Sequence, residues 1–266
     1  MPVKKALFFL ALSLIYLPVL AQQSGSSSYN NKNSTKQQRI NQMMKMEEEG
    51  DLIYDHYGLF GFRMTTNGYG IFYEHGKFIN NRKNSLLEFE LNEIKDPKDH
   101  KVPVSGDGYT YNYVAIGRLN NFYEFKASYG QQILFGGKGN KNGVAVTYLY
   151  SGGLSLGMLK QYQLDVYTAQ SIVTFKSTYP TIFDSAYGVY DAVGLGGGWN
   201  HLQFTPGLNA KLAARFDYGR FNQTITAFET GVTAEYYFSK MPLMAYVPPK
   251  QLFFNAYIAI MFGKRK

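Results

Sequence analysis

The chain has 266 residues, with 27 Lys and Arg against 19 Asp and Glu, and it contains no Cys. A sequence without Cys excludes disulfides, thiolate metal sites, cysteine nucleophiles and a lipid anchor at a signal junction. Aromatic residues reach 17%, with 23 Tyr and 20 Phe, and together with 27 Gly they favour strands and turns over helices.

Residues 1–21 have the parts of a cleaved secretory signal. Lys4 and Lys5 form a charged start, and Ala6–Leu20 is an apolar run shorter than a membrane-spanning helix needs. Small residues precede the expected cleavage after Ala21. The alternative, an uncleaved membrane anchor, is disfavoured by the length of the run. We therefore expect an exported protein.

Once Lys4 and Lys5 are removed, the net charge falls from +8 to +6. An exported protein does not normally meet nucleic acid, so we expect no nucleic-acid partner and attribute the charge to solvated loops and anionic lipid headgroups.

After residue 21 no apolar stretch is long enough for a spanning helix. If the mature chain is integral to a membrane, it must be a closed barrel, because open sheet edges are not satisfied in hydrocarbon.

Residues 22–50 are predicted to be a flexible periplasmic leader. Gln22–Asn33 is polar and low in complexity, whereas Ser34–Gly50 has the pattern of a marginal amphipathic helix. The leader is either a plug or docking segment below a barrel, or a loosely held extension.

Residues 51–266 are predicted to be all-β and to form a transmembrane antiparallel β-barrel of about ten strands, with 8–12 possible. Apolar and polar residues alternate with the period of a strand; Leu208, Leu212 and Phe216, for example, oppose Lys211 and Arg215. The expected strands are Tyr57–Thr66, Tyr69–Phe78, Ser85–Ile94, Tyr109–Leu119, Phe122–Gln131, Gly143–Ser151, Leu154–Tyr167, Gly207–Tyr218, Gln223–Phe238 and Gln251–Phe262.

The connectors alternate between short and long, which favours an outer-membrane barrel over a soluble sandwich. The expected periplasmic turns are Ile79–Asn84, Asn120–Asn121, Gly152–Gly153 and Gly219–Asn222. The expected extracellular connectors are Asn67–Gly68, Lys95–Gly108, Gln132–Asn142, Thr168–Pro206 and Ser239–Lys250. Aromatic residues at strand ends suit the headgroup level of a bilayer, and the tail Gly263–Lys266 is expected in the periplasm.

Four segments resemble a family of outer-membrane barrels from Bacteroidetes: Tyr57–Tyr73 (YGLFGFRMTTNGYGIFY), Glu93–Lys98 (EIKDPK), Gly117–Tyr123 (GRLNNFY) and Phe262–Lys266 (FGKRK). The resemblance covers most of residues 57–266 and leaves out the leader. It implies an outer-membrane location and offers no catalytic residue.

Directing the polar faces inward predicts a charged lumen. The expected members are Arg63, Glu74, Glu88, Glu90, Arg118, Glu124, Lys126, Lys211, Arg215, Asp217, Glu229 and Glu235. A barrel of this size is nearly filled by its own side chains, so a charge-paired, sealed interior is the favoured interpretation. The alternative is a narrow, selective, porin-like solute channel lined by the same residues.

The long connector Thr168–Pro206 is rich in aromatic residues, which suggests a lid or a partner surface. Its candidate residues are Tyr179, Phe183, Tyr187, Tyr190 and Trp199. A third interpretation is that the connector hides another strand pair.

No sequence motif indicates a catalytic, metal-binding or phosphate-binding site. His56, His75, His100 and His201 lack metal-ligand spacing, and the glycine-rich segments Gly136–Gly143 and Gly194–Gly198 lack the setting of a phosphate loop. A weaker alternative is an outer-membrane hydrolase, for which the one fitting set is Asp184, Asp191 and His201.

We expect no enzyme and no cofactor. The predicted partners are outer-membrane lipid and other envelope proteins, and the predicted role is structural or interactive, as an accessory subunit of an envelope assembly.

Overall fold

The computed structural model describes residues 54–105, 111–137, 143–167, 171–176, 189–194, 197–219, 224–245 and 247–266, together with Gln38. Chain contacts separate residues 1–53 from Tyr54–Lys266. The predicted signal peptide, 1–21, lies outside the described residues, and so does the predicted leader, 22–50, apart from Gln38, which is helical. Among the residues described, no helix has both the length and the apolar character needed to cross a membrane.

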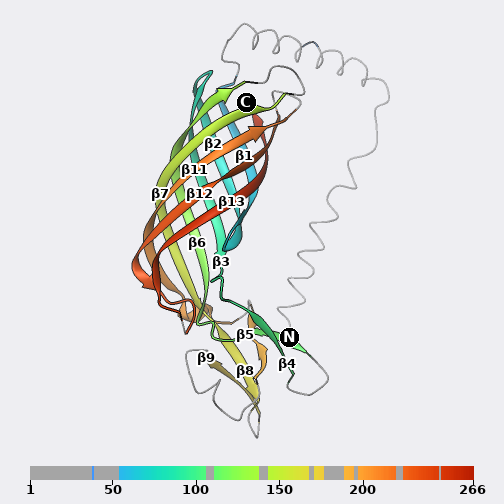
Figure 1. Ribbon diagram of the computed structural model, residues 1–266, viewed down its shortest axis with the longest axis vertical. Helices are drawn as coiled ribbons and strands as arrows, with labels where there is room; N and C mark the ends of the chain where they lie inside the picture. Colours follow the sequence, from blue (N-terminus) through green and yellow to red (C-terminus); the bar gives the residue numbers. More distant parts are fainter. Residues whose placement is uncertain are drawn as a thin grey trace, which may run out of the picture. The chain divides into compact units, whose positions relative to one another are not determined.

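Eight antiparallel strands close into a barrel in the order β1-β13-β12-β11-β7-β6-β3-β2 (Figure 1). Each neighbouring pair, including β1 with β13, is joined by an antiparallel ladder, and the β12–β13, β2–β3 and β6–β7 ladders each contain one register shift. The strands are β1 (His56–Thr65), β2 (Gly68–Asn80), β3 (Lys83–Ile94), β6 (Asn120–Gly136), β7 (Ala145–Gln161), β11 (Gln203–Asp217), β12 (Thr224–Met241) and β13 (Lys250–Arg265). The predicted architecture is therefore confirmed, and eight is the lower end of the predicted range.

The predicted division into ten strands is wrong at two places. Gly143–Ser151 and Leu154–Tyr167 are not separated by a turn, because Gly152 and Gly153 lie inside the single strand β7. Gly153 faces the β6 backbone so closely that a Cβ atom would lie 2.0 Å from the carbonyl oxygen of Ala127. Gly153 thus permits close strand packing, and neither glycine reverses the chain.

The second error concerns Tyr109–Leu119, which is not a barrel strand. Within it, β5 (Asn112–Ala115) pairs with β4 (Lys101–Val104) in a separate two-stranded sheet. Apolar and polar residues alternate in any strand that has one buried face. This alternation therefore does not distinguish a strand of the barrel from a strand of the small β4–β5 sheet.

These changes reassign two connectors. We call the end where β1 starts and β13 finishes the terminal end, and the opposite end the loop end. Connectors 81–82, 137–144 and 218–223 lie at the terminal end, and 66–67, 95–119, 162–202 and 242–249 lie at the loop end. Gln132–Asn142 was therefore predicted at the wrong end, and Asn120–Asn121 begins β6 at the loop end. The two longest connectors, 95–119 and 162–202, both lie at the loop end, but 137–144 at the terminal end is as long as 242–249 at the loop end.

The two longest connectors fold together at the loop end. β8 (Gln163–Tyr167) follows β7 after one residue and pairs with β9 (Ile172–Lys176) and β10 (Val189–Ala192). This sheet and the β4–β5 sheet share a small apolar core that includes Val114, Leu164 and Val166. We call this assembly of β4, β5, β8, β9 and β10 the outer unit. The third interpretation of the long connector, hidden strands, is thus correct for β9 and β10.

The barrel strands direct mostly apolar side chains outward, and the charged side chains of the barrel centre point inward, as the alternation predicted. Leu208, Leu212 and Ile258 are exposed, whereas Lys211 and Asn255 are buried. The last strand extends three residues beyond its predicted end at Phe262: β13 continues to Arg265, which pairs with Tyr57 of β1.

Candidate functional site

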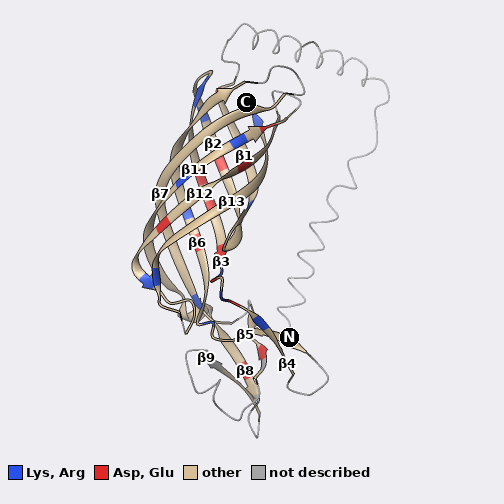
Figure 2. Cartoon of the chain, in the orientation of Figure 1, with Lys and Arg blue, Asp and Glu red and all other residues tan. Residues whose placement is uncertain are grey.

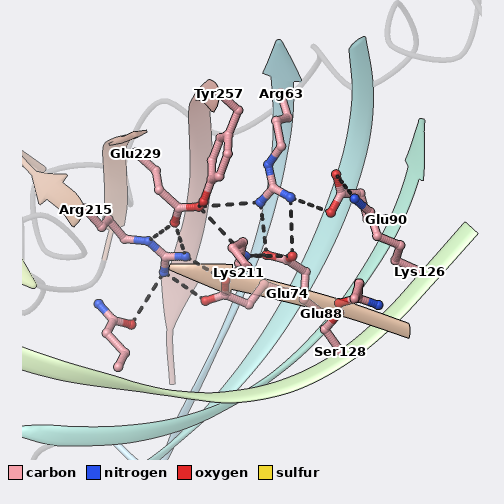
Figure 3. Close-up of polar contacts among 12 residues, drawn as sticks. Arg63, Glu74, Glu88, Glu90, Lys126, Ser128, Lys211, Arg215, Glu229 and Tyr257 are labelled. Atoms are coloured by element: carbon pink, nitrogen blue, oxygen red, sulfur yellow. Dashed lines mark hydrogen bonds and ion pairs between the residues drawn. The ribbon is translucent and has the colours of Figure 1, made fainter. Parts of the chain in front are cut away.

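A network of buried ion pairs crosses the lumen (Figure 3). Arg215 on β11 donates from Nη2 to Oε2 of Glu74 on β2 at 2.6 Å, and its Nη2 also lies 2.7 Å from Oε2 of Glu229 on β12. Lys211 on β11 binds Glu88 on β3, with Nζ 2.6 Å from Oε2. Because β11 lies several strands away from β2 and β3 around the barrel, these contacts span its interior.

Arg63 on β1 connects the two sides of this network. Its guanidinium donates to Glu90, Glu88 and Glu229, and its side chain is fully buried. The guanidinium carbon lies 4.6 Å from the ring centre of Phe72 and 4.4 Å from that of Tyr257. Stacking on two aromatic faces stabilises a cation that has left water.

Lys126 on β6 forms the other half of the network. Its Nζ lies 2.6 Å from Oε1 of Glu124, 2.8 Å from Oε1 of Glu235 and 3.7 Å from Oε1 of Glu90. Since Glu90 also binds Arg63, all of these charged groups belong to one connected cluster.

Three inward tyrosine hydroxyls complete the network, and the sequence interpretation did not include them. Tyr57 donates to Glu74 at 2.8 Å, Tyr237 to Glu124 at 2.7 Å and Tyr257 to Glu229 at 2.6 Å. Each carboxylate thus gains a neutral donor, which offsets part of its desolvation. The signal was present in the sequence, because each tyrosine lies at an inward position of its strand.

Apolar layers cover the network toward both ends of the barrel. Toward the terminal end lie buried residues such as Leu59, Leu86 and Met261. Toward the loop end the buried cluster is Ile94, Phe122, Leu159, Tyr237, Met241, Leu243, Met244 and Phe253.

The connector 242–249 helps to close the loop end. Leu119 donates its backbone N–H to the carbonyl of Leu243 at 2.8 Å, and Ala245 donates to the carbonyl of Gly117 at 2.8 Å. The side chains around Lys126 and Lys211 leave no space for a water molecule between them. An eight-stranded barrel has room for little more than its own side chains. The described centre of this lumen is therefore filled by its own side chains around Lys126 and Lys211.

Two members of the predicted network do not join the central cluster. Arg118 follows β5, where its guanidinium donates to Asp99 and to Asn121 and lies 5.0 Å from the ring centre of Tyr162. Asp217 is near the terminal end and accepts from Arg265 at 2.5 Å. The other ten predicted residues, Arg63, Glu74, Glu88, Glu90, Glu124, Lys126, Lys211, Arg215, Glu229 and Glu235, are brought together.

Arg118 and Tyr162 connect the outer unit to the barrel. The Tyr162 hydroxyl accepts from the backbone N–H of Ala115 at 3.1 Å, and Tyr162 N–H donates to the carbonyl of Leu119 at 2.9 Å. Burial raises the pKa of the Tyr162 hydroxyl, which keeps it neutral in this apolar setting.

Of the predicted aromatic loop surface, only Trp199 has a described side chain. It begins the short 3₁₀ helix η2 (Trp199–His201), after Gly198 in a left-handed conformation with φ 84°. Its ring stacks on Tyr123 of β6 with centroids 6.2 Å apart, and Nζ of Lys160 lies 4.9 Å from its centre. Trp199 thus fastens the connector to the barrel wall.

The remaining loop candidates are described incompletely or not at all. Tyr179, Phe183 and Tyr187 lie outside the described residues, and Tyr190 is described only as part of the β10 backbone. Asp184 of the hydrolase alternative is also outside, so its convergence with Asp191 and His201 stays a prediction. Within the described ranges, no group of three His, Asp or Glu side chains is placed to hold a metal ion.

No protein-family model matches the chain, and no curated protein matches it significantly. Among solved structures it is similar to Neisserial surface protein A, with 7% identity and a TM-score of 0.39 over 80% of this chain and 97% of that one. It is also similar to Ail, the attachment invasion locus protein of Yersinia pestis, with 8% identity, a TM-score of 0.38 and coverage of 81% and 100%. For the N-terminal β-barrel domain of Pseudomonas aeruginosa OprF the values are 9%, 0.34, 79% and 98%. Identities and TM-scores this low do not support an assignment, so the fold is established by the strand pairing alone.

Proposed function

We propose that this chain is an integral outer-membrane barrel with a sealed lumen, and that its role is structural or interactive rather than catalytic or conductive. The observation that carries the proposal is the lumen, in which ion pairs cross from wall to wall between two apolar layers. Such an interior stabilises a barrel and leaves its loops free to act as a partner surface.

The outer surface supports insertion into lipid. Large apolar side chains stand exposed around the barrel: Phe60, Phe62, Ile71, Leu87, Phe89, Leu91, Leu208, Leu212, Ile258 and Ile260. Tyrosines and phenylalanines such as Tyr69, Tyr236 and Phe254 lie nearer the strand ends. An exposed apolar surface of this extent suits a bilayer and is unfavourable in water.

Membrane insertion is tested by refolding the protein into neutral vesicles. We expect the folded barrel to migrate faster than the heated protein on a detergent gel and to resist protease. A mature protein that stays soluble and monomeric without detergent would contradict the proposal. N-terminal sequencing that begins at Gln22 would support the cleaved signal peptide.

Orientation can be tested with single cysteines, because the chain has none of its own. Lys101 in β4 and Asn81 in the β2–β3 turn are both exposed, at the loop end and the terminal end respectively. We expect a membrane-impermeant thiol reagent applied to intact cells to label Lys101→Cys and not Asn81→Cys. The reverse pattern would overturn the proposed orientation.

The rival function, a narrow solute channel, is disfavoured by the same packed lumen. We expect planar-bilayer recordings of the purified protein to show no steady unitary conductance. Reproducible steps whose ion selectivity changes in Lys211→Gln would instead support the channel.

The interaction role rests on the outer unit, which gives the loop end a folded surface with its own core. We propose that it contacts another envelope protein, as in an accessory subunit of a larger assembly. Purification from native membranes after mild crosslinking is expected to recover a defined partner, and replacement of connector 162–202 by a short turn is expected to remove it. A protein that is always recovered alone would argue against this role.

We also propose that the chain belongs with the Bacteroidetes barrels that residues 57–73 resemble. Homologues found mainly in Bacteroidetes genomes would support this origin, and a different distribution would contradict it.

A further inference from the structure

A cluster of basic side chains lies on the outer face of three adjacent strands at the terminal end of the barrel. It consists of His56 on β1, His75 and Lys77 on β2, and Lys264 on β13, all exposed. We call it the basic patch. Figure 2 shows Lys and Arg positions at the end of the barrel where the C-terminus lies.

The strand register holds these residues next to one another. His56 is the Cα partner of Lys77, and Gly58 is the partner of both His75 and Lys264. The rings of His56 and His75 have centroids 5.8 Å apart. The patch is therefore fixed by three rigid, mutually bonded strands.

Gly58 lies in the middle of the patch, and the end of the Tyr73 side chain lies over it. A Cβ atom at Gly58 would lie 3.2 Å from the hydroxyl oxygen of Tyr73. Gly58 is flanked by Lys264 on one side and His75 on the other. A small anionic group between these side chains would meet an ammonium, an imidazole and a phenolic hydroxyl, all of which can donate hydrogen bonds.

Acidic side chains offset the patch only in part. The one outward acid on the described barrel strands is Glu93, at the loop end, where it accepts from Tyr69 at 2.5 Å and lies 3.6 Å from Nζ of Lys95. Asp55, which precedes His56, is exposed, and its backbone carbonyl accepts from the N–H of Phe78 at 2.9 Å, so it lies beside the patch. None of the ion pairs found among the described residues involves Lys77 or Lys264. Two lysines and two histidines against one carboxylate leave the patch positive.

The patch also lies at the edge of the exposed apolar surface. Phe60, the next outward residue after Gly58 on β1, pairs with Tyr73 and Phe262, and these three rings are 54%, 48% and 59% exposed. A barrel inserted by its apolar surface would hold the patch at the level of the lipid headgroups.

We infer that the basic patch is a binding site for the phosphate of an anionic phospholipid headgroup. The inference rests on the proposed membrane insertion, which sets the depth of the patch. Charge complementarity favours an anionic lipid, and donors held around Gly58 by three rigid strands favour one localised headgroup over a diffuse counterion layer.

The test uses native mass spectrometry of the full, detergent-purified protein with phosphatidylglycerol or phosphatidylcholine. We expect the wild type to retain phosphatidylglycerol in preference to phosphatidylcholine. In Lys77→Gln/Lys264→Gln the affinity should fall about fivefold for each lysine removed, the size expected of a basic residue near an anionic surface. The matched control is Lys98→Gln/Lys101→Gln, which removes the same charge from exposed positions at the loop end and should bind normally.

A second variant tests the phenolic donor without changing the charge. Tyr73→Phe removes the hydroxyl that lies over Gly58 and should weaken phosphatidylglycerol binding while leaving the barrel folded, because the position faces outward. Equal losses in patch and control variants, or no preference for phosphatidylglycerol, would overturn the inference. Displacement of the lipid by millimolar inorganic phosphate would assign the site to free phosphate and overturn the lipid assignment.

Failure of this inference can be distinguished from failure of the proposed function. Insertion and heat-modifiable migration are measured in neutral phosphatidylcholine vesicles, which do not need the basic patch. A barrel that inserts there but shows no lipid preference contradicts the site alone, whereas a chain that does not insert contradicts the membrane proposal.

Discussion

Arg215 and Glu74 lie on opposite walls of the barrel, yet Nη2 of the arginine is 2.6 Å from Oε2 of the glutamate. In the order β1-β13-β12-β11-β7-β6-β3-β2, the strands β11 and β2 are four steps apart in either direction. This ion pair therefore spans the lumen, and it is one of the contacts that fill it.

We predict that breaking this pair is costly. Arg215→Met leaves Glu74 and Glu229 buried without their main cation, and removing one partner of a buried pair typically costs about 3–5 kcal/mol. Urea unfolding in detergent or lipid would measure the change. The control Lys95→Met removes one partner of the part-exposed pair with Glu93 and should cost about 1 kcal/mol or less. Equal effects of the two substitutions would contradict a buried, solvent-free network.

The packing of Tyr57 makes Gly76 sensitive to substitution. A Cβ atom at Gly76 would lie 2.0 Å from the ring of Tyr57, whose hydroxyl donates to Glu74. We expect Gly76→Ala to destabilise the barrel by about 1–3 kcal/mol through overpacking. The matched control is Gly152→Ala in β7, where the nearest atom is 3.4 Å away and unfolding should change little. Tolerance of alanine at position 76 would show that Tyr57 is free to move.

The proposed bilayer contact predicts a dependence on depth. Leu212 and Leu252 are exposed to a similar degree, 61% and 62%, but Leu212 lies well inside β11 and Leu252 lies near the start of β13. In lipid, Leu212→Arg should cost about 2–4 kcal/mol and Leu252→Arg about 0–1 kcal/mol. Equilibrium unfolding from vesicles gives both values. Similar small costs at the two positions would indicate that this face does not lie against hydrocarbon.

The attachment of the outer unit predicts a local effect. Arg118→Ala removes the contacts with Asp99, Asn121 and the ring of Tyr162, all of which lie at the base of the unit. We expect faster protease cleavage within residues 95–119, while the barrel keeps its heat-modifiable migration, because the barrel ladders do not include Arg118. Lys98→Ala, at an exposed position of the same connector, should leave cleavage unchanged. Loss of the whole barrel in Arg118→Ala would place this residue in the core fold instead.

The amino-acid sequence by itself determined the class of fold and the direction of most side chains. The alternation in 207–218 and 251–262 fixed which residues face out, because successive residues of a strand point to opposite sides. The same alternation predicted that Arg63, Lys211, Glu88 and Glu229 would share one interior.

Only the tertiary structure decided the number of barrel strands and the partners within the lumen. Apolar and polar residues alternate in the same way in a barrel strand and in a strand of a small outer sheet. The pattern in residues 109–119 therefore did not indicate which sheet this segment joins. Glycine has two uses, and only the neighbouring strand showed that Gly153 serves close packing rather than a turn. Contacts such as Arg215 with Glu74 depend on closure of the barrel, which brings together residues that no local spacing connects.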